Sequence, residues 1–87
     1  MIPGMQVEMT AEAMQGLADA PTGMKGRIND VLARLESWPN ISGAKPLRHE
    51  LRGAFRIRTG SWRILFRIKS QCVLVFRIDD RRDVYER

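Results

Sequence analysis

The sequence predicts an α+β fold, in which a hairpin of two helices covers one face of a small, mostly antiparallel sheet, with the element order β-α-α-β-β-β. Three observations predict this fold. Residues 5–9 alternate between apolar and polar side chains, residues 10–38 carry apolar side chains at helical spacing, and residues 55–78 contain three runs of strand composition separated by turn residues. With 87 residues, the chain has room for one core, so we expect residues 1–87 to form a single domain.

The first helix follows the strand at residues 5–9 directly. Thr10 is a good N-cap, and Glu12 in the first turn interacts favourably with the helix dipole. Pro21 ends the helix. Its predicted apolar stripe consists of Ala11, Met14, Leu17 and Ala18.

The second helix begins within residues 22–27 and ends before Pro39. Its apolar residues recur at helical spacing, and they are Ile28, Val31, Leu32, Leu35 and Trp38. The two helices are close enough in sequence to form a hairpin. Residues 40–53 then form a loop that is rich in turn formers and bases.

The turns predict the register of the strands at residues 55–59, 62–68 and 72–78. A two-residue turn at Gly60-Ser61 places Arg58 opposite Arg63. For the next hairpin we predict a three-residue turn at residues 69–71, which places Arg63 opposite Arg77. A two-residue turn there would move Arg77 to the apolar face, so we reject it.

This register divides the sheet into two faces. The predicted core face consists of Phe55, Ile57, Trp62, Ile64, Phe66, Ile68, Cys72, Leu74, Phe76 and Ile78. The predicted opposite face consists of Arg56, Arg58, Arg63, Arg67 and Arg77, together with Leu65, Val73 and Val75. Like charges directly opposite each other cost about 0.2–1 kcal/mol per pair, and residues 51–78 contain no acid to relieve them. An ordinary solvated face normally mixes both signs, so this arginine set favours a bound phosphate chain, because arginine forks bind phosphate oxygens bidentately.

Charge is also distributed unevenly along the chain, whose net charge is +5. Residues 1–44 carry three bases and five acids, whereas residues 45–87 carry twelve bases and five acids. The two segments therefore have net charges of −2 and +7, which suggests a negatively charged partner or substrate, with nucleic acid the leading candidate.

Several classes of protein and site are excluded. No apolar run approaches the roughly 20 residues of a membrane span, and the N-terminus lacks the features of a signal peptide. Cys72 is the only cysteine and His49 the only histidine, so the sequence offers no internal disulfide, no multi-cysteine zinc site and no ligand spacing for a metal. We therefore expect a cytoplasmic protein with no cofactor, no metal and no membrane partner.

The predicted basic face lies near a single phenol. Tyr85 follows Arg81 and Arg82 shortly after the last strand, and adjacent cations stabilise a phenolate. The ring could also stack on a base. The ordinary alternatives stay open at this point: Tyr85 packs on the sheet edge, and His49 is a plain loop residue.

Two stretches of the sequence, PLRHELRGAFRIRTGSWRILFRI at residues 46–68 and RIDDRRDVYER at residues 77–87, resemble the RelE/ParE toxin superfamily of bacterial and archaeal toxin–antitoxin systems. The shared pattern is a Pro-Leu-basic loop, a glycine before an Arg-Ile-Arg strand, a Gly-x-aromatic-Arg turn and a terminal Arg-Arg-Asp-Val-Tyr. The early strand and the helix pair also fit, so the resemblance spans nearly the whole chain and implies a RelE-like microbial RNase fold.

Resemblance to the RelE branch implies a ribosome-dependent endoribonuclease that cleaves mRNA by promoting attack of a ribose 2′-hydroxyl on the adjacent phosphate. Such a toxin supplies acid/base groups and charge stabilisation. The implied catalytic residues are Arg63 at the scissile phosphate, Arg81 or Arg82 as a charge-stabilising arginine, and Tyr85, which stacks on or protonates the reacting nucleotide. The predicted RNA-binding residues are Arg48, Arg56, Arg58, Lys45, Arg67 and Arg77.

Two positions depart from the family pattern. Many relatives carry a histidine just before the Arg-Arg pair, where this sequence has Asp80, and one subgroup carries a glutamate as general base at the position of Lys45. Glu50 lies nearby but does not match. An all-basic site, in which a lysine or arginine takes the role of the base, fits this sequence better.

The resemblance also implies partners. These are a cognate antitoxin with an acidic segment that wraps the basic face, mRNA on the ribosome, and operator DNA reached only through the antitoxin. Two other functions stay open: a gyrase-inhibiting toxin of the ParE branch, which shares the fold but usually lacks the arginine-tyrosine constellation, and an inactive RelE-fold binding protein.

Overall fold

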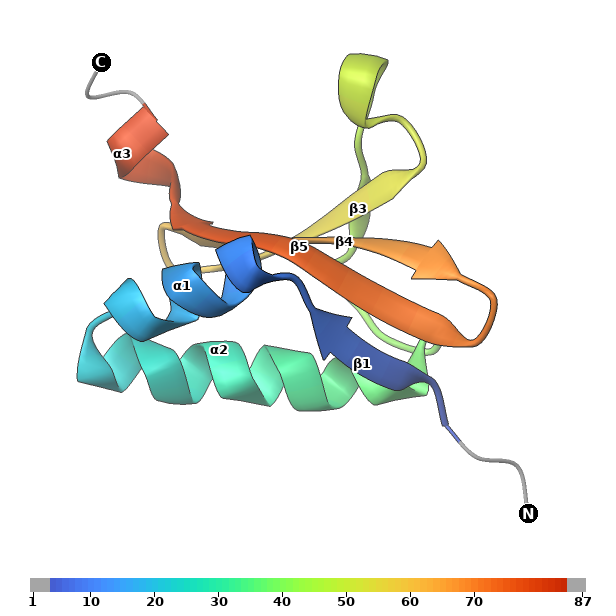
Figure 1. The fold of residues 1–87 in the computed structure, drawn as a ribbon, viewed down its shortest axis with the longest axis horizontal. Helices are drawn as coiled ribbons and strands as arrows, with labels where there is room; N and C mark the ends of the chain where they lie inside the picture. The colour runs from blue at the N-terminus through green and yellow to red at the C-terminus, as the bar shows by residue number, and fades with distance from the viewer. Residues whose placement is uncertain (1–3, 85–87) are drawn as a thin grey trace.

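The computed structural model describes residues 4–84, in which a mixed five-stranded sheet packs on two helices that cover one of its faces (Figure 1). The sheet has the order β1-β5-β4-β3-β2. Its strands are β1 (Gln6–Met9), β2 (Lys45–Pro46), β3 (Ala54–Thr59), β4 (Trp62–Lys69) and β5 (Cys72–Asp80). The helices are α1 (Ala11–Asp19), α2 (Thr22–Arg34) and the short α3 (Arg81–Val84), with 3₁₀ turns η1 (Leu35–Ser37) and η2 (His49–Leu51). The predicted α+β class and element order are confirmed, and β2, η2 and α3 are additions to them.

Helix α1 is capped as predicted but packs through other residues. The Thr10 hydroxyl accepts a hydrogen bond from the backbone N–H of Ala13 at 3.1 Å. The predicted apolar stripe is correct for Leu17, which packs against the core, but wrong for its other members, because Met14 is 52% exposed and the buried alanines are Ala13 and Ala20. Gly16 lies against the backbone of Ile78, where a Cβ atom would collide with the carbonyl group. Small residues on this side thus let α1 approach β5 closely, and a search for large apolar residues overlooks them.

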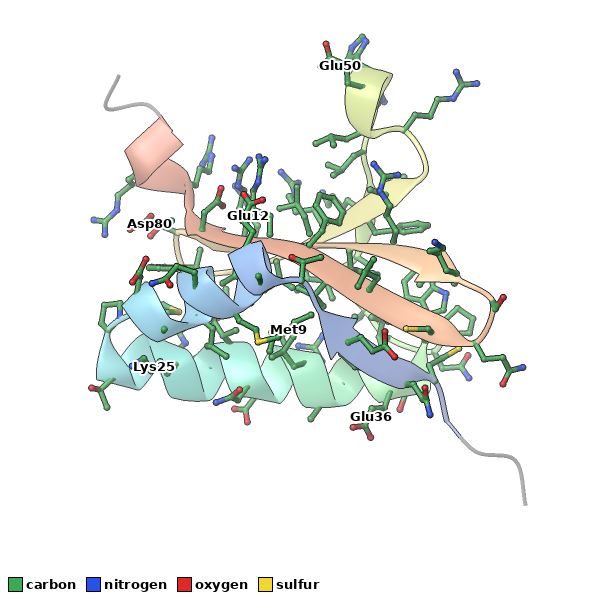
Figure 2. All side chains as sticks on the ribbon, viewed as in Figure 1. Met9, Glu12, Lys25, Glu36, Glu50 and Asp80 are labelled. Atoms are coloured by element: carbon green, nitrogen blue, oxygen red, sulfur yellow. The ribbon has the colours of Figure 1, made fainter. Side chains whose placement is uncertain are left out.

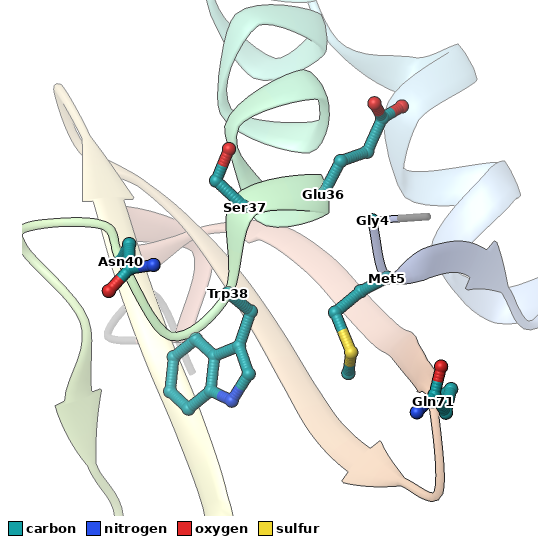
Figure 3. A pocket seen from close by; sticks show the side chains of 7 residues that line it. All are labelled: Gly4, Met5, Glu36, Ser37, Trp38, Asn40 and Gln71. Atoms are coloured by element: carbon teal, nitrogen blue, oxygen red, sulfur yellow. The ribbon is translucent and has the colours of Figure 1, made fainter. Parts of the chain in front are cut away.

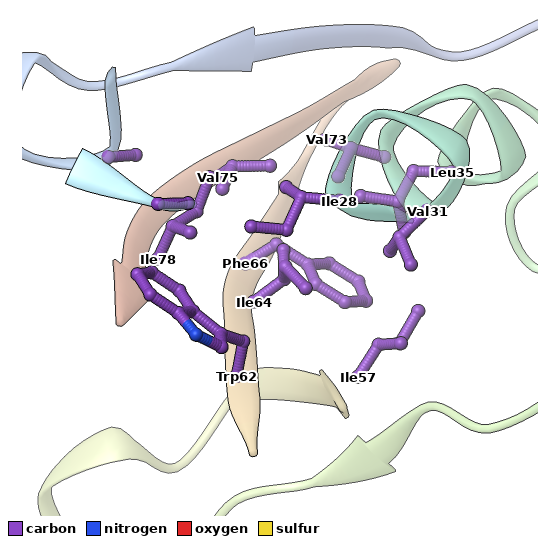
Figure 4. Packing of buried hydrophobic residues seen from close by; sticks show 12 residues of the cluster. Ile28, Val31, Leu35, Ile57, Trp62, Ile64, Phe66, Val73, Val75 and Ile78 are labelled. Atoms are coloured by element: carbon purple, nitrogen blue, oxygen red, sulfur yellow. The ribbon is translucent and has the colours of Figure 1, made fainter. Parts of the chain in front are cut away.

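Helix α2, which ends at Arg34, and the η1 turn that follows it supply the larger side chains of the helix layer. Ile28, Val31 and Leu35 are buried, as their spacing predicts, and Leu32 and Trp38 pack at the margin. They meet the aromatic and aliphatic residues of the sheet in one continuous core (Figure 4). Within it Phe66 is fully buried and its ring contacts those of Phe55 and Trp38, with centroid distances of 5.7 and 5.4 Å.

The β3–β4 hairpin has the predicted register. Thr59 pairs with Trp62, Arg58 with Arg63, and so on along the hairpin. Gly60 has φ +61° at the first turn position, which a type II′ turn requires and which glycine adopts without steric cost. The turn chemistry and the strand pattern therefore specify the same pairing.

The predicted β4–β5 register is wrong along the whole hairpin, by one residue near the turn and by two residues beyond the bulge, where the faces are nevertheless as predicted. The turn contains two residues, so Lys69 pairs with Cys72 and Phe66 pairs with Val75. A β-bulge then leaves Phe76 without a partner, and Arg77 pairs with Leu65. A two-residue turn alone would place Arg77 on the apolar face. The extra residue of the bulge shifts Arg77 to the side of the sheet away from the helices, so a two-residue turn is compatible with the sequence.

The bulge also reassigns the residues that precede it. Val73 and Val75 are fully buried in the core, where Cys72, Leu74 and Phe76 were predicted. Thr10 holds the bulge in place: its hydroxyl donates to the Phe76 carbonyl at 3.3 Å, and its backbone N–H donates to the Val75 carbonyl at 2.9 Å. The cap of α1 and the register change in β5 thus depend on the same residue.

Candidate nucleic-acid interface

The face of the sheet away from α1 and α2, which we call the outer face, carries the predicted arginines. Nitrogen-tipped side chains stand on it between α3 and the η2 loop, which both rise on this side (Figures 1 and 2). In antiparallel sheets, residues directly opposite each other share a face. The register therefore sorts the outer-face residues into transverse rows.

One row contains Lys45, Arg56, Leu65 and Arg77, contributed in order by β2, β3, β4 and β5. Strand β2 was not predicted, and it brings Lys45 directly opposite Arg56. The loop that leads from it supplies Arg48, which is exposed. Lys45, Arg56 and Arg77 are therefore brought together, and Arg48 lies beyond the end of β2.

The neighbouring row contains Arg58, Arg63 and Asp79. The predicted pairing of Arg63 with Arg77 is wrong, because the bulge places Asp79 opposite Arg63 instead. Arg63 donates two hydrogen bonds to the Asp79 carboxylate, from Nε at 3.0 Å and from Nη2 at 2.9 Å. Sequence analysis missed Asp79 because it ended the strand at residue 78.

Arg56 lies at the centre of a cluster of positive charge. Its pKa is lowered first by burial and then by repulsion from Arg58, Arg63 and Arg81. Arg81 is the first residue of α3, and its backbone N–H donates to the Ser61 carbonyl at 2.7 Å. The structure thus joins β3, β4 and the start of α3 in one group, which we call the arginine cluster: Arg56, Arg58, Arg63 and Arg81.

Two predicted RNA-binding arginines have partners at the edge of this group. The guanidinium of Arg67 lies over the ring of Phe76, 5.1 Å from its centroid. Arg77 lies 3.5 Å from a carboxylate oxygen of Glu12, at the start of α1. Both ends of this second pair are well exposed, so the ion pair contributes little to stability.

Asp80, which stands where many relatives carry a histidine, caps α3. One of its carboxylate oxygens accepts the backbone N–H of Arg82 at 3.0 Å, and the other lies 3.1 Å from Nη2 of the same residue. These bonds, helped by a hydrogen bond from Ser61, lower the pKa of Asp80 to about 2. Such a carboxyl is ionised at neutral pH, so it cannot act there as the general acid that a histidine could be.

Other types of site have no support in residues 4–84. The described His, Cys, Asp and Glu residues form no cluster that could hold a metal ion. Burial and the neighbouring Glu8 raise the pKa of Cys72, which keeps the thiol protonated. No helix of this part of the chain is long and apolar enough to cross a membrane. Tyr85 lies outside the described residues.

A hollow of about 540 Å³ lies beside the N-terminus of β1 and is lined by residues that include Glu36, Trp38 and Gln71 (Figure 3). Its lining contains no basic residue, and its one charged group is a carboxylate. It does not suit an anionic ligand, and the arginine cluster contributes nothing to it. The candidate interface is therefore the outer face.

Comparison with known proteins identifies the family. The model of the ParE toxin of type II toxin–antitoxin systems matches residues 7–85. The chain belongs to this family. It is also 47% identical to the toxin RelG of Mycobacterium tuberculosis over 83 residues, which cover 93% of this chain and 95% of that protein.

Solved structures place this type II toxin in the RelE/ParE superfamily. The chain is similar to one in the RelBE2 toxin–antitoxin complex of M. tuberculosis, with a TM-score of 0.77 and 30% identity over 92% of this chain and all of the other. It also shares its fold with the isolated RelE toxin of E. coli, with a TM-score of 0.71 and 14% identity over 94% of this chain and 92% of that one. The predicted superfamily is confirmed.

Proposed function

We propose that this toxin is a ribosome-dependent endoribonuclease that cuts mRNA in the cytoplasm and so inhibits translation. The observation that carries the proposal is the arginine cluster on the outer face, where burial and then repulsion from Arg58, Arg63 and Arg81 lower the pKa of Arg56. A set of like charges held together by the fold is stabilised when an anion binds among them. An RNA backbone supplies such anions at regular intervals.

Cleavage of RNA requires fixed positive groups around the scissile phosphate. When a 2′-hydroxyl attacks the adjacent phosphate, negative charge builds up on the phosphoryl oxygens, and fixed guanidinium groups aimed at those oxygens stabilise the transition state. We assign Arg63 to the scissile phosphate because it lies on a central strand within the cluster. Arg56 and Arg58 on β3 hold the flanking backbone, with Lys45, Arg48, Arg67 and Arg77 as further contacts.

Of the two adjacent C-terminal arginines, we assign charge stabilisation to Arg81. Its charge acts on Arg56, which places it within the cluster. Arg82 instead binds the Asp80 carboxylate through Nε and Nη2, at 3.4 and 3.1 Å. Helix α3 directly follows β5. The next residue in the sequence is Tyr85, to which the family resemblance assigns stacking on, or proton donation to, the reacting nucleotide.

For the base, Lys45 is the candidate that fits an all-basic site. An arginine does not lose its proton in proteins, and both aspartates near the cluster are engaged by arginines. Lys45 lies directly opposite Arg56 in the register and is exposed. A Lys45→Met variant would retain RNA binding more than it retains cleavage.

We also propose a cognate antitoxin as partner. Solved relatives include RelB–RelE antitoxin–toxin complexes from Methanococcus jannaschii and from E. coli. The basic outer face suits an acidic antitoxin segment by charge complementarity, and such a segment would compete with RNA for the same arginines. Any contact with operator DNA would run through the antitoxin.

The test is cleavage of a defined mRNA on programmed ribosomes by the purified toxin, with the ends of the products mapped. We expect cleavage by the wild type, and a loss on the order of 100-fold or more for Arg63→Ala, since one preorganised donor to a developing charge is worth that much. Tyr85→Phe should lower the rate as well. The matched control is Arg27→Ala, which removes an exposed arginine from α2, on the helix side of the sheet. Intact mRNA with folded wild-type toxin would refute the proposal.

A second candidate function is inhibition of DNA gyrase, since the matching family model is that of the ParE toxin. The two functions separate in one expression experiment. Gyrase inhibition would induce the DNA-damage response and leave mRNA intact, whereas ribonuclease activity would cut mRNA without that response. A toxin that left both DNA and mRNA unaffected, and growth unchanged, would be an inactive RelE-fold binding protein.

A further inference from the structure

Asp79 and Asp80 are adjacent in sequence but serve different partners. Because successive residues of a strand point to opposite faces, Asp79 meets Arg63 on the outer face while Asp80 turns to α3. We propose that Asp79 is a positioning residue that fixes the guanidinium of Arg63 for RNA cleavage, at the expense of RNA affinity. This inference rests on the proposed ribonuclease function, because it takes Arg63 as the arginine at the scissile phosphate.

The contact has the geometry of an orienting device. Two parallel hydrogen bonds, from Nε at 3.0 Å and from Nη2 at 2.9 Å, fix both the position and the plane of the guanidinium. The two side chains are only 21% and 27% exposed. Their backbones lie directly opposite each other on β4 and β5, two neighbouring strands of the sheet interior. An arginine held in this way keeps one orientation, whereas an exposed arginine samples many.

The surroundings explain why Arg63 needs such a partner. Arg58 lies directly opposite it on β3, and both belong to the arginine cluster. Repulsion from these charges would drive an unheld Arg63 side chain toward solvent. Asp79 supplies a counter-charge at Arg63 itself, within a row whose other members are both arginines.

The same contact opposes RNA binding. Asp79 occupies the Nε–Nη2 edge of Arg63, one of the edges through which a guanidinium binds phosphate, and it places a negative charge beside the bound backbone. Affinity for the ground state does not by itself raise the rate of the chemical step, whereas orientation of the reacting groups does. Asp79 therefore lowers RNA affinity and raises the rate of cleavage.

These opposite effects give the test. We expect Asp79→Asn to bind a short single-stranded RNA several-fold more tightly than the wild type, because a negative charge is removed. Its single-turnover cleavage on saturated ribosomes should fall on the order of 10- to 100-fold, since displacement of a positioned group by about 1 Å has effects of that size. Asp79→Glu restores the charge on a longer stem, so its RNA affinity should return toward that of the wild type while its cleavage stays low.

Glu12→Gln is the matched control. It also removes one carboxylate paired with an arginine of the outer face, Arg77, in the neighbouring row. Its RNA affinity should rise to a similar extent, but its cleavage rate should be unchanged. Equal loss of cleavage in both variants would reduce the role of Asp79 to overall charge and would overturn the proposal.

A further readout concerns the orientation itself. In the free toxin, the Nε–H proton of Arg63 should give a slowly exchanging NMR signal that is lost in Asp79→Asn and kept in Glu12→Gln. The pH dependence of cleavage should keep its shape in Asp79→Asn, because a positioning residue exchanges no proton with the substrate. Loss of one limb of that profile would make Asp79 a general base and contradict the inference.

The outcomes separate this inference from the function on which it rests. If wild-type toxin cuts mRNA and folded Asp79→Asn cuts it equally fast, the inference fails and the ribonuclease function stands. If the wild type cuts no RNA, the ribonuclease function fails, and the positioning role falls with it.

Discussion

The two faces of the sheet are built from alternate residues of the same strands, yet they follow opposite rules. The helix-covered face buries Ile64 and Phe66 completely and packs them against α2. The outer face gathers arginines, and both burial and repulsion from its neighbours lower the pKa of Arg56. Burial of apolar side chains on the first face stabilises the fold, whereas repulsion among the arginines on the second face destabilises it. Truncation of a core side chain should therefore lower stability, whereas neutralisation of Arg56 should raise it.

The largest effect is expected on the helix-covered face. Phe66→Ala would remove a fully buried ring that contacts Phe55 and Trp38, and should lower the free energy of unfolding by about 3–5 kcal/mol. Typical domains have about 5–15 kcal/mol in total, so this variant would be close to unfolding at room temperature. Urea denaturation followed by circular dichroism measures the change. A loss below 1 kcal/mol would mean that the core is not organised around this ring.

The next largest effect is expected at Thr10, which is hydrogen-bonded to the β-bulge in β5. Thr10→Val keeps the shape of the side chain but removes the hydroxyl that accepts from Ala13 and donates to Phe76. We expect a loss of about 1–2 kcal/mol, the size of a strong N-cap effect. Thr22→Val is the control, because Thr22 is exposed and the start of α2 has no side-chain cap. Equal losses in both variants would contradict the role of Thr10 at the bulge.

A smaller effect depends on pH. Folding lowers the pKa of Asp80 from 3.8 to about 2, so its stabilising contribution is present above pH 4 and is lost as the pH falls toward 2. We expect about 1 kcal/mol for this contribution, since Arg82 is 75% exposed and solvent screens the pair. Urea denaturation of the wild type and Asp80→Asn between pH 2 and 7 measures it. The two stability curves should converge at low pH, and parallel curves would exclude the role of this carboxylate.

The smallest effect is expected on the outer face, and its sign is reversed. Arg56→Gln should raise the free energy of unfolding by a few tenths of a kcal/mol at low salt, because it relieves repulsion within the arginine cluster. The gain should vanish at about 1 M salt, where charges are screened beyond about 3 Å. RNA affinity should fall in the same variant. Arg27→Gln on α2 serves as the control, and a destabilised Arg56→Gln would refute the contrast between the faces.

The sequence predicted the fold where local signals and long-range pairing agree. In the β3–β4 hairpin, Gly60 suits the turn and the strands alternate on both sides of it, so the register is correct. In the β4–β5 hairpin, the bulge at Phe76 reconciles two conflicting patterns. The bulge is hydrogen-bonded to Thr10, 66 residues away, and no pattern within the hairpin reveals this contact.

The site shows the same division. The placement of Arg56, Arg58 and Arg63 on one face follows from alternation alone and is confirmed. The partnership of Arg63 with Asp79 follows from the bulge and was missed. Lys45 was chosen by its charge and its position before Pro46, but only β2 brings it opposite Arg56. Alternation thus gives the face of a residue, whereas its neighbours across the sheet depend on the exact pairing.

The place of β5 in the sheet has a consequence for the order of events during synthesis. It comes after the other four strands in sequence but lies between β1 and β4 in space. Contacts between residues so far apart in sequence form late in folding, and ribosomes add only about 5–20 residues per second. A nascent chain that has not reached residue 80 already contains both covering helices and most arginines of the cluster. It still lacks the complete strand β5, against which the helices pack and the sheet assembles. The two helices and the arginine cluster therefore reach their defined places only after residues 72–80 have joined the sheet.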